Sequence, residues 1–400
     1  MRKLMHLSTC IVLAIGLAQL LLGQPAKAEL DMLGRPVTPA LQGGQVRSYY
    51  VAAEELDWDY APFGRDETMG REFTEPALIY VERKDGRVGR VHRKALLIEY
   101  TDDTFRVRKP KPPEWAHTGL LGPILRAEVG DTIRVVFKNK TSRPYSLHPH
   151  GVFYSKAHEG APSNDGTKPE DKRDDSVKPG DNQVYVWPVP VRAGPGPRDQ
   201  SSIAWLYHSH VDRIRDTNSG LIGAIVVTRR GMAEPDGKPK DVDREIITLW
   251  KIFDETQSWY IARDVKRAGG DYAAIKDDPA FKASNRKHTI NGFIFGNLPL
   301  KSLTVREGER VRWYVTSLGS GTDIHTPYWH GNTVLVAGRR MDAVPLLPAQ
   351  LIVADMVPDN VGIWMLQSQV ENSLSAGMTL RYQVLPREKP VPRTARTRRR

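Results

Sequence analysis

The chain has 400 residues, of which 40% are hydrophobic and 26% are charged, as expected for a globular protein of about two domains. Its formal net charge of +11 lies mostly at the two ends. Residues 1–28 contribute +3 and residues 387–400 contribute +6, which leaves only +2 for residues 29–386. Nucleic-acid-binding domains carry a basic patch or stripe. The nearly neutral charge of residues 29–386 therefore argues against a nucleic-acid-binding domain of this basic type. We expect no nucleic-acid partner.

The first 28 residues have the pattern of a secretory signal peptide. Arg2 and Lys3 form a charged start, an apolar run covers residues 11–22, and residues 26–28 supply an Ala-x-Ala cleavage site. The apolar run is too short for a membrane span, and no later segment is apolar enough to be one. The only cysteine, Cys10, lies inside this segment. We therefore expect a periplasmic or secreted protein with no transmembrane segment and no disulfide.

Strand signals dominate the remaining sequence. Amphipathic helical periodicity is weak, and residues 260–268 are the best candidate for a helix. An all-β protein built from β-sandwiches is therefore predicted. Its clearest strands are short, β-branched or aromatic stretches bounded by Gly, Pro, Asn and Asp, at residues 46–51, 132–137, 222–227, 245–250 and 311–315.

An internal repeat divides the chain into two similar halves. Residues 128–134 resemble residues 306–312, and a His-Gly pair follows each of them, at His150-Gly151 and at His330-Gly331. A repeat of this kind indicates duplicated domains. Residues 159–202 are rich in Pro, Gly and Asp and are predicted to be a long connection inside the first domain. We assign a signal peptide to 1–28, a first domain to 29–232, a linker to 233–243, a second domain to 244–386 and a basic tail to 387–400.

Two histidine pairs have the spacing of metal ligands on β-strands. They are His148-Pro149-His150 and His208-Ser209-His210, and residues two apart on a strand point to the same face. Two such strands side by side would gather four imidazoles, a nitrogen ligand set that suits copper, zinc, iron or nickel. A blue-copper centre also needs a cysteine sulfur, which the exported chain is not expected to contain.

Motifs in the same order in both halves resemble those of bacterial two-domain multicopper oxidases of the ceruloplasmin type. The resemblance implies two cupredoxin-like Greek-key β-sandwich domains in tandem. It also implies a homotrimer, in which a three-copper cluster lies between domain one of one subunit and domain two of the next. The matching stretches are 121–132, 148–151, 156–160, 207–212 and 219–223 in the first half, and 290–297, 323–331 and 362–378 in the second.

The resemblance assigns copper ligands residue by residue. In the first domain, His148 matches the type 2 ligand, and His150, His208 and His210 match type 3 ligands. In the second domain, His330 matches a type 3 ligand, so five of the family's eight cluster histidines are present.

The second domain departs from the family at its other copper positions. Ser368 stands in place of the type 1 cysteine, and a hydroxyl cannot replace the soft thiolate that makes a fast copper couple. Neutral amides in place of imidazoles are poor copper ligands as well. Of the type 1 ligands, His325 and Met378 are matched, whereas Ser368 and Ser373 replace the other two ligands, a cysteine and a histidine. Tyr328 replaces a type 2 histidine, and Gln367 and Gln369 replace two type 3 histidines. These seven residues are the degenerate copper positions.

The resulting functional hypothesis is an exported copper-binding protein without independent oxidase activity. Copper is the expected cofactor, with one or two ions rather than three, and no catalytic residue is assigned. Three alternatives remain open. In the first, the chain is an active copper oxidoreductase whose copper centre holds fewer ions. In the second, it is a partner subunit that forms a mixed trimer with an intact homologue. In the third, it is a structural scaffold.

Two further features carry weaker expectations. Lys156, Asp171, Asp174 and Asp175 resemble a calcium site of ceruloplasmin-like first domains, since carboxylate oxygens suit calcium, and a solvated acidic loop is the alternative. The Arg-rich tail is interpreted either as a contact with an anionic envelope surface or as a solvated, disordered segment.

Overall fold

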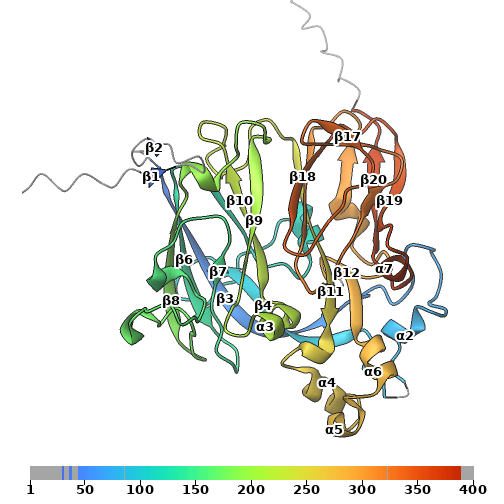
Figure 1. Ribbon diagram of the computed structural model, residues 1–400. Helices are drawn as coiled ribbons and strands as arrows, with labels where there is room; N and C mark the ends of the chain where they lie inside the picture. Colours follow the sequence, from blue (N-terminus) through green and yellow to red (C-terminus); the bar gives the residue numbers. More distant parts are fainter. Residues whose placement is uncertain (1–28, 31–35, 38–43, 85, 322, 389–400) are drawn as a thin grey trace, which may run out of the picture. The chain divides into compact units, whose positions relative to one another are not determined.

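A computed structural model describes residues 29–30, 36–37, 44–84, 86–321 and 323–388 (Figure 1). The predicted signal peptide and the tail beyond residue 388 lie outside these residues. Contacts divide the chain into an N-terminal unit, residues 1–42, and a second unit, residues 43–400. The first unit contains β1 (Glu29–Leu30) and β2 (Pro36–Val37), which pair antiparallel. All other described elements belong to the second unit.

Two four-stranded sheets form the first β-sandwich of the second unit. Their strand orders are β4-β3-β6-β8 and β5-β10-β9-β7. The pairs β3–β6 and β5–β10 are parallel, and the other neighbours are antiparallel. The strands are β3 (Val46–Asp59), β4 (Val91–Tyr100), β5 (Ile124–Glu128), β6 (Thr132–Asn139), β7 (His148–Pro149), β8 (Asn182–Pro188), β9 (Ser202–His208) and β10 (Ile222–Thr228).

The second sandwich repeats this arrangement. Its sheets have the orders β12-β11-β14-β18-β16-β17 and β13-β20-β19-β15, with β11–β14 and β13–β20 parallel. The strands are β11 (Arg244–Asp254), β12 (Arg286–Ile290), β13 (Thr304–Arg306), β14 (Val311–Ser317), β15 (Pro327–Trp329), β16 (Val334–Val336), β17 (Arg339–Met341), β18 (Leu351–Met356), β19 (Gly362–Ser368) and β20 (Thr379–Leu385).

The matching strand orders confirm the predicted fold class. The order β4-β3-β6-β8 corresponds to β12-β11-β14-β18, and β5-β10-β9-β7 corresponds to β13-β20-β19-β15. All five strand stretches expected from the sequence lie within β3, β6, β10, β11 and β14. The structure therefore accounts for the sequence repeat as two copies of one all-β sandwich.

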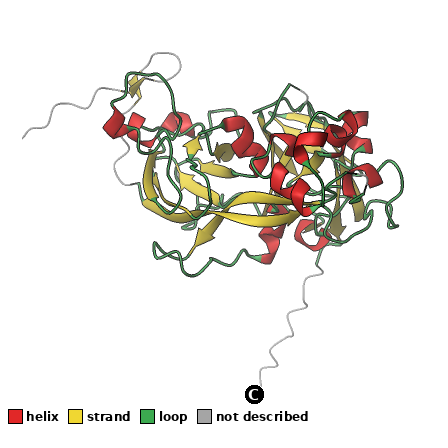
Figure 2. Ribbon diagram, turned by 90° about the horizontal axis from the view of Figure 1, so that it is seen from below, coloured by secondary structure: helices red, strands yellow, loops and turns green. Residues whose placement is uncertain are grey.

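The described helices are short, as Figure 2 shows, and the expected helix at 260–268 is present as α4. The α-helices are α2 (Leu78–Val81), α3 (Arg213–Ser219), α4 (Ile261–Arg267), α5 (Tyr272–Ile275), α6 (Pro279–Ser284) and α7 (Glu371–Ser375). The 3-10 helices are η1 (Pro113–Thr118), η2 (Lys156–His158), η3 (Pro169–Asp171), η4 (Val191–Ala193), η5 (Glu255–Gln257) and η6 (Leu300–Leu303). In the described residues no helix is long and apolar enough to cross a membrane.

One sequence interpretation was wrong. Residues 159–202 are not a connection throughout, because they contain strand β8 along with η3 and η4. Strand β8 pairs antiparallel with β6 and buries Tyr185 and Trp187 on its inward face. Flanking Pro, Gly and Asp residues concealed this short alternating stretch in the sequence.

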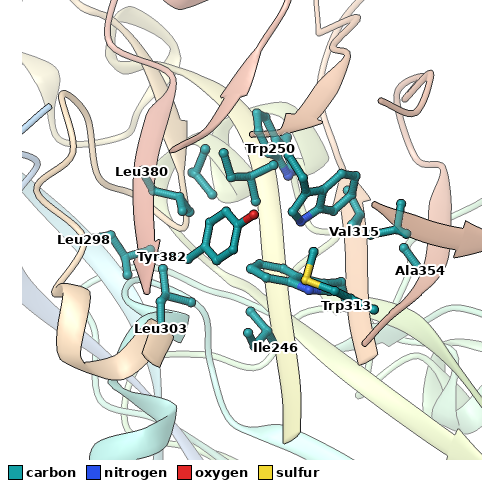
Figure 3. Close-up of a cluster of buried hydrophobic side chains, with 14 of the residues drawn as sticks. Ile246, Trp250, Leu298, Leu303, Trp313, Val315, Ala354, Leu380 and Tyr382 are labelled. Atoms are coloured by element: carbon teal, nitrogen blue, oxygen red, sulfur yellow. The ribbon is translucent and has the colours of Figure 1, made fainter. Parts of the chain in front are cut away.

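Strand β11 joins the two sandwiches because both of its faces are buried. Ile246 and Trp250 point into the core of the second sandwich, where Trp313 packs edge-to-face on Tyr382 at a ring distance of 5.9 Å (Figure 3). Ile247, on the opposite face, belongs to a second cluster that also contains residues from β4, β9 and β10 of the first sandwich. The two sandwiches therefore share a hydrophobic core.

A buried ionic network lies beside this shared core. The Lys94 ammonium donates to the Glu255 carboxylate and to the Asn218 carbonyl, each at 2.5 Å. The Tyr60 hydroxyl also donates to Glu255, and His92 Nδ1 lies 3.8 Å from the same carboxylate. Lys94, Glu255, Tyr60 and His92 are fully buried. The network links β4 of the first sandwich to η5, which follows β11 of the second.

The ionic network makes a stability prediction. Glu255→Ala leaves the Lys94 ammonium buried without its carboxylate, so we expect a loss of about 3–5 kcal/mol in the free energy of unfolding. Replacing both partners, in Glu255→Leu with Lys94→Met, is expected to cost less because no unpaired charge remains. Chemical denaturation measures both variants. As a control, Asp243→Ala removes an exposed partner of Arg310 and is expected to destabilise the protein far less than Glu255→Ala. Equal losses for Glu255→Ala and Asp243→Ala would contradict the prediction.

Candidate metal centre

Pairing between β7 and β9 brings the two histidine motifs together. His148 is the direct cross-strand partner of His208. The ring centroids of His148 and His210 are 5.0 Å apart, and those of His150 and His208 are 5.1 Å apart. The Nε2 atoms of His150 and His208 lie 3.0 Å from each other. The structure thus gathers all four imidazoles at one end of the first sandwich.

Strand alternation alone does not determine the position of the His210 ring. Strand β9 ends at His208, so Ser209 and His210 lie in the loop that leads to α3. The His210 amide donates to Ser146 Oγ at 3.0 Å, and Ser209 Oγ donates to the Asp216 carboxylate at 2.7 Å. Buried polar side chains therefore hold this loop. The sequence analysis missed Ser146 and Asp216, because neither residue type nor spacing marks them as supports for the site.

Backbone carbonyls orient two of the rings. His148 Nδ1 lies 2.7 Å from the Glu159 carbonyl, and His208 Nδ1 lies 2.9 Å from the Ser209 carbonyl. A carbonyl only accepts hydrogen bonds, so each Nδ1 carries the proton and the lone pair of each ring lies on Nε2. In His208 this atom faces His150 Nε2 at 3.0 Å. A hydrogen bond of this kind fixes the tautomer and the direction of a metal-ligating imidazole.

Burial keeps His148, His150 and His208 neutral near physiological pH. Desolvation lowers the pKa of His150 to about 4 and that of His208 to about 3, and it lowers the pKa of His148 as well. A histidine must be deprotonated at the ligating nitrogen before it binds a metal. These rings are therefore available to a cation without first releasing a proton.

A cleft of about 510 Å³ leads to the first histidine pair. His148 and His150 line it together with Phe153, Tyr154 and Trp205. Gly151 lets the Trp205 indole approach, since a Cβ at this position would lie 2.1 Å from the ring and its φ is +73°. The site is therefore open to small molecules on one side and packed against aromatic rings.

The equivalent edge of the second sandwich carries the altered positions. Tyr328 on β15 pairs with Gln367 on β19 in the same way that His148 pairs with His208. The Tyr328 and His330 rings are 4.5 Å apart, and His330 Nε2 is buried without a hydrogen-bond partner. Gln367 is buried and Gln369 is exposed. Gly331 leaves room for the Trp364 indole, as Gly151 does for Trp205. The backbone at this edge is therefore similar in the two sandwiches.

The positions that match type 1 ligands are enclosed in the second sandwich. His325, Ser368 and Met378 are fully buried, and Ser373 is 2% exposed. Both ring nitrogens of His325 are without a hydrogen-bond partner. Ser368 accepts a hydrogen bond from Val370, whereas Ser373 Oγ lies 3.2 Å from His288 Nδ1. His288 is thus a structural partner of this pocket.

The residues do not complete a single-ion site within one chain. No group of three or more His, Cys, Asp or Glu side chains is arranged to hold one metal ion in the part of the chain that the structure describes. Within the same residues, no ring contact or hydrogen bond joins His330 to the four first-sandwich histidines. The four rings pack on one another, with centroids of contacting rings 5.0–5.8 Å apart.

The residues of the possible calcium site have different surroundings. Lys156 pairs with Glu159 at 2.5 Å and with Asp165 at 2.7 Å, while Asp171 is exposed at the end of η3. Asp174 is buried, and its Oδ2 accepts from the Gly160 amide at 2.7 Å, whereas its Oδ1 has no partner. Burial raises the pKa of Asp174 and of the neighbouring Asp175. These two carboxyls are thus the remaining candidates for a cation.

Comparison with solved structures places this fold among copper proteins built of cupredoxin domains. A solved multicopper oxidase superimposes with a TM-score of 0.52 at 16% identity, covering 90% of this chain and 94% of that one. A copper nitrite reductase from Nitrosomonas europaea gives a TM-score of 0.52 at 15% identity, covering 85% and 93%. At these identities the likeness concerns the fold alone.

Sequence comparison identifies the family. Two family models described as multicopper oxidase match residues 108–231 and 273–388. The chain is 43% identical to Ferroxidase HEPHL1 of Homo sapiens over 348 residues, 40% identical to Hephaestin of Mus musculus over 351, and 38% identical to Ceruloplasmin of Homo sapiens over 339. These matches cover 84–86% of this chain and 29–31% of the relatives. The chain belongs to the multicopper oxidase family and resembles its ceruloplasmin-type members, and this membership implies copper.

The depressed pKa values predict acid sensitivity of the metal-free protein. The folded pKa of His208, about 3, lies below the value near 6.5 in the unfolded chain. The unfolded state therefore binds more protons, and stability present above pH 6.5 is lost as the pH falls toward 3. His208→Gln should remove on the order of 2 kcal/mol of the loss between pH 7 and 4.5.

Thermal unfolding of both proteins at the two pH values measures this difference. The other buried histidines, His92, His117, His288 and His325, are common to both proteins and act as an internal control. An identical pH dependence of the two melting temperatures would contradict the assignment of a neutral, desolvated His208.

Proposed function

We propose that this chain is an exported copper-binding protein of the multicopper oxidase family that lacks independent oxidase activity. The observation that carries the proposal is the convergence of four imidazoles at the ends of β7 and β9, two of them held by backbone carbonyls. Bound copper would supply one-electron redox chemistry. The role of the four histidines is to bind and orient the metal in a cleft open to small ligands.

A second chain is proposed to complete the centre. One chain offers paired imidazoles and no three-ligand group in its described part, whereas His330 Nε2 is buried and unpartnered on the opposite sandwich. In a homotrimer, His330 of a neighbouring subunit would add a fifth imidazole to the four of the first sandwich. We propose one or two coppers per site, because Tyr328, Gln367 and Gln369 offer no further imidazole.

The lack of a type 1 centre is proposed from the donor atoms in the second sandwich. A fast copper couple depends on a thiolate ligand, and the corresponding position is occupied by the Ser368 hydroxyl. His325 and Met378 alone provide one imidazole and one weak thioether. Without a relay of this kind, electrons from a substrate would have no route to the histidine cluster.

A mixed trimer is the second candidate function. The first sandwich is complete in histidines and the second is not, so this chain would contribute its histidine edge to the cluster of an intact homologue. The observation that favours this candidate is that, in the described residues, His330 makes no contact with the four histidines of the first sandwich. Copurification with an intact multicopper oxidase at a fixed ratio would support it.

Three further proposals accompany the main one. We propose export through the signal-like segment at 1–28 to the periplasm or the extracellular space. Asp174 and Asp175 are proposed as carboxylates of a calcium site, supported by the unpartnered Oδ1 of Asp174. The Arg-rich tail is proposed to contact an anionic envelope surface.

Copper stoichiometry with electron paramagnetic resonance tests the main proposal. We expect one or two coppers per chain, nitrogen hyperfine structure and no steady oxygen uptake with a phenol or ferrous iron. His208→Ala should lose most of the copper, while His158→Gln, which removes a histidine outside the cluster, should keep it. Absence of copper after reconstitution would contradict the proposal. Oxygen uptake abolished by His208→Ala would favour the oxidase alternative instead.

Restoring the missing ligands tests the type 1 interpretation. Ser368→Cys combined with Ser373→His recreates a Cys-His set beside His325 and Met378, so we expect an intense visible thiolate-to-copper band that the unchanged protein lacks. Ser368→Cys with Ser375→His places the added imidazole two residues away and serves as the control. A visible band in the unchanged protein, or none in copper-loaded Ser368→Cys/Ser373→His, would show that these positions are misassigned.

A further inference from the structure

A second cavity lies at the edge of the first sandwich opposite the histidines. In the two sheets, β4 and β5 are the edge strands on one side, while β7 and β8 are the edge strands on the other. A pocket of about 400 Å³ opens at the β4–β5 edge, beneath the segment that contains η1. Pockets of 300–1,000 Å³ suit small organic ligands. This cavity is therefore separate from the cleft beside His148 and His150.

The wall of the pocket is mainly apolar. Ile98 and Ile124 are only half-buried, although they pack against the core shared by the two sandwiches. Trp115 presents an indole held between Arg126 at 5.2 Å and Arg244 at 6.0 Å from its ring. Leu96 and Leu120 complete the apolar wall. These side chains offer a surface for an apolar or aromatic body.

Most charged groups at the pocket are already paired with an opposite charge. Lys109 contacts Glu99 at 2.8 Å, and Arg108 contacts Glu54. The guanidinium of Arg126 contacts the Glu245 carboxylate at 2.8 Å. Asp236, the remaining acid of the lining, accepts a hydrogen bond from the Lys238 amide at 3.0 Å. The three ion pairs cancel in charge, whereas the amide bonded to Asp236 leaves the negative charge of that carboxylate in place.

Lys111 differs from these groups. Its ammonium donates to two neutral oxygens, Thr118 Oγ1 at 2.8 Å and the Gly119 carbonyl at 3.3 Å, and no ion pair involves it in the described residues. The side chain is solvent-accessible, yet the surrounding protein lowers its pKa to about 8. A cation with this environment gains from an anionic partner, because a hydrogen bond to a charged group is stronger than one to a neutral group.

We propose that this pocket binds a small amphipathic carboxylate, with the carboxylate on the Lys111 ammonium and the apolar body against Ile98, Leu120 and Trp115. Charge complementarity selects an anion, and the volume and apolar wall select an aromatic or short aliphatic body. The proposal does not depend on copper, since no residue of the histidine cluster lines the cavity.

Isothermal titration of the full chain with 2-naphthoate at pH 7 tests the proposal. We expect saturable binding that Lys111→Met weakens by at least about 10-fold and that Lys111→Arg retains. Lys178→Met, which removes an exposed lysine of another loop, should bind as the unchanged protein does. The neutral 2-naphthalenemethanol should bind equally to the unchanged protein and to Lys111→Met.

A pH profile keeps the test valid if Lys111→Met folds poorly. Raising the pH from 7 to 9.5 deprotonates Lys111, so naphthoate affinity of the unchanged protein should fall, while Lys111→Arg, whose guanidinium stays charged, should show little change. No binding by the unchanged protein at millimolar naphthoate, or equal affinity of the folded Lys111→Met variant, would overturn the proposal.

Discussion

The pairing of His148 with His208 is the contact on which the candidate site depends. Strand β7 has only two residues, yet its register against β9 decides which side chains face each other. A shift of one residue would turn the imidazoles toward opposite faces of the sheet. The backbone carbonyls of Glu159 and Ser209 then fix the direction of two rings. This register, with the loop contacts that place His210, brings four nitrogen donors together.

The second sandwich retains this register and differs in its donors. Tyr328 faces Gln367 as His148 faces His208. In each sandwich a glycine close after this strand, Gly151 or Gly331, leaves room for a tryptophan ring. Fold and side-chain chemistry therefore vary separately in this chain. Core packing and strand register are duplicated, while the candidate metal ligands are concentrated on the first sandwich. This separation is the basis for proposing copper binding without a type 1 relay.

The fold and the histidine cluster were largely predictable because they rest on local patterns. Period-two alternation and turn residues locate most strands, and two His-x-His motifs identify the edge at which the four imidazoles meet. Strand β8 was missed because its signal is short and lies between Pro- and Gly-rich segments. The hydrogen bond from His210 to Ser146 and the buried pair of Lys94 and Glu255 join residues 64 and 161 positions apart. Contacts of this kind depend on tertiary packing, which a single sequence does not display.

X-ray absorption at the copper edge tests the central claim most directly. In copper-loaded protein, the account predicts imidazole nitrogen as the principal scatterer around copper and no short copper–sulfur distance. A copper–sulfur contribution in the unchanged protein, or copper coordinated without imidazole, would contradict the account.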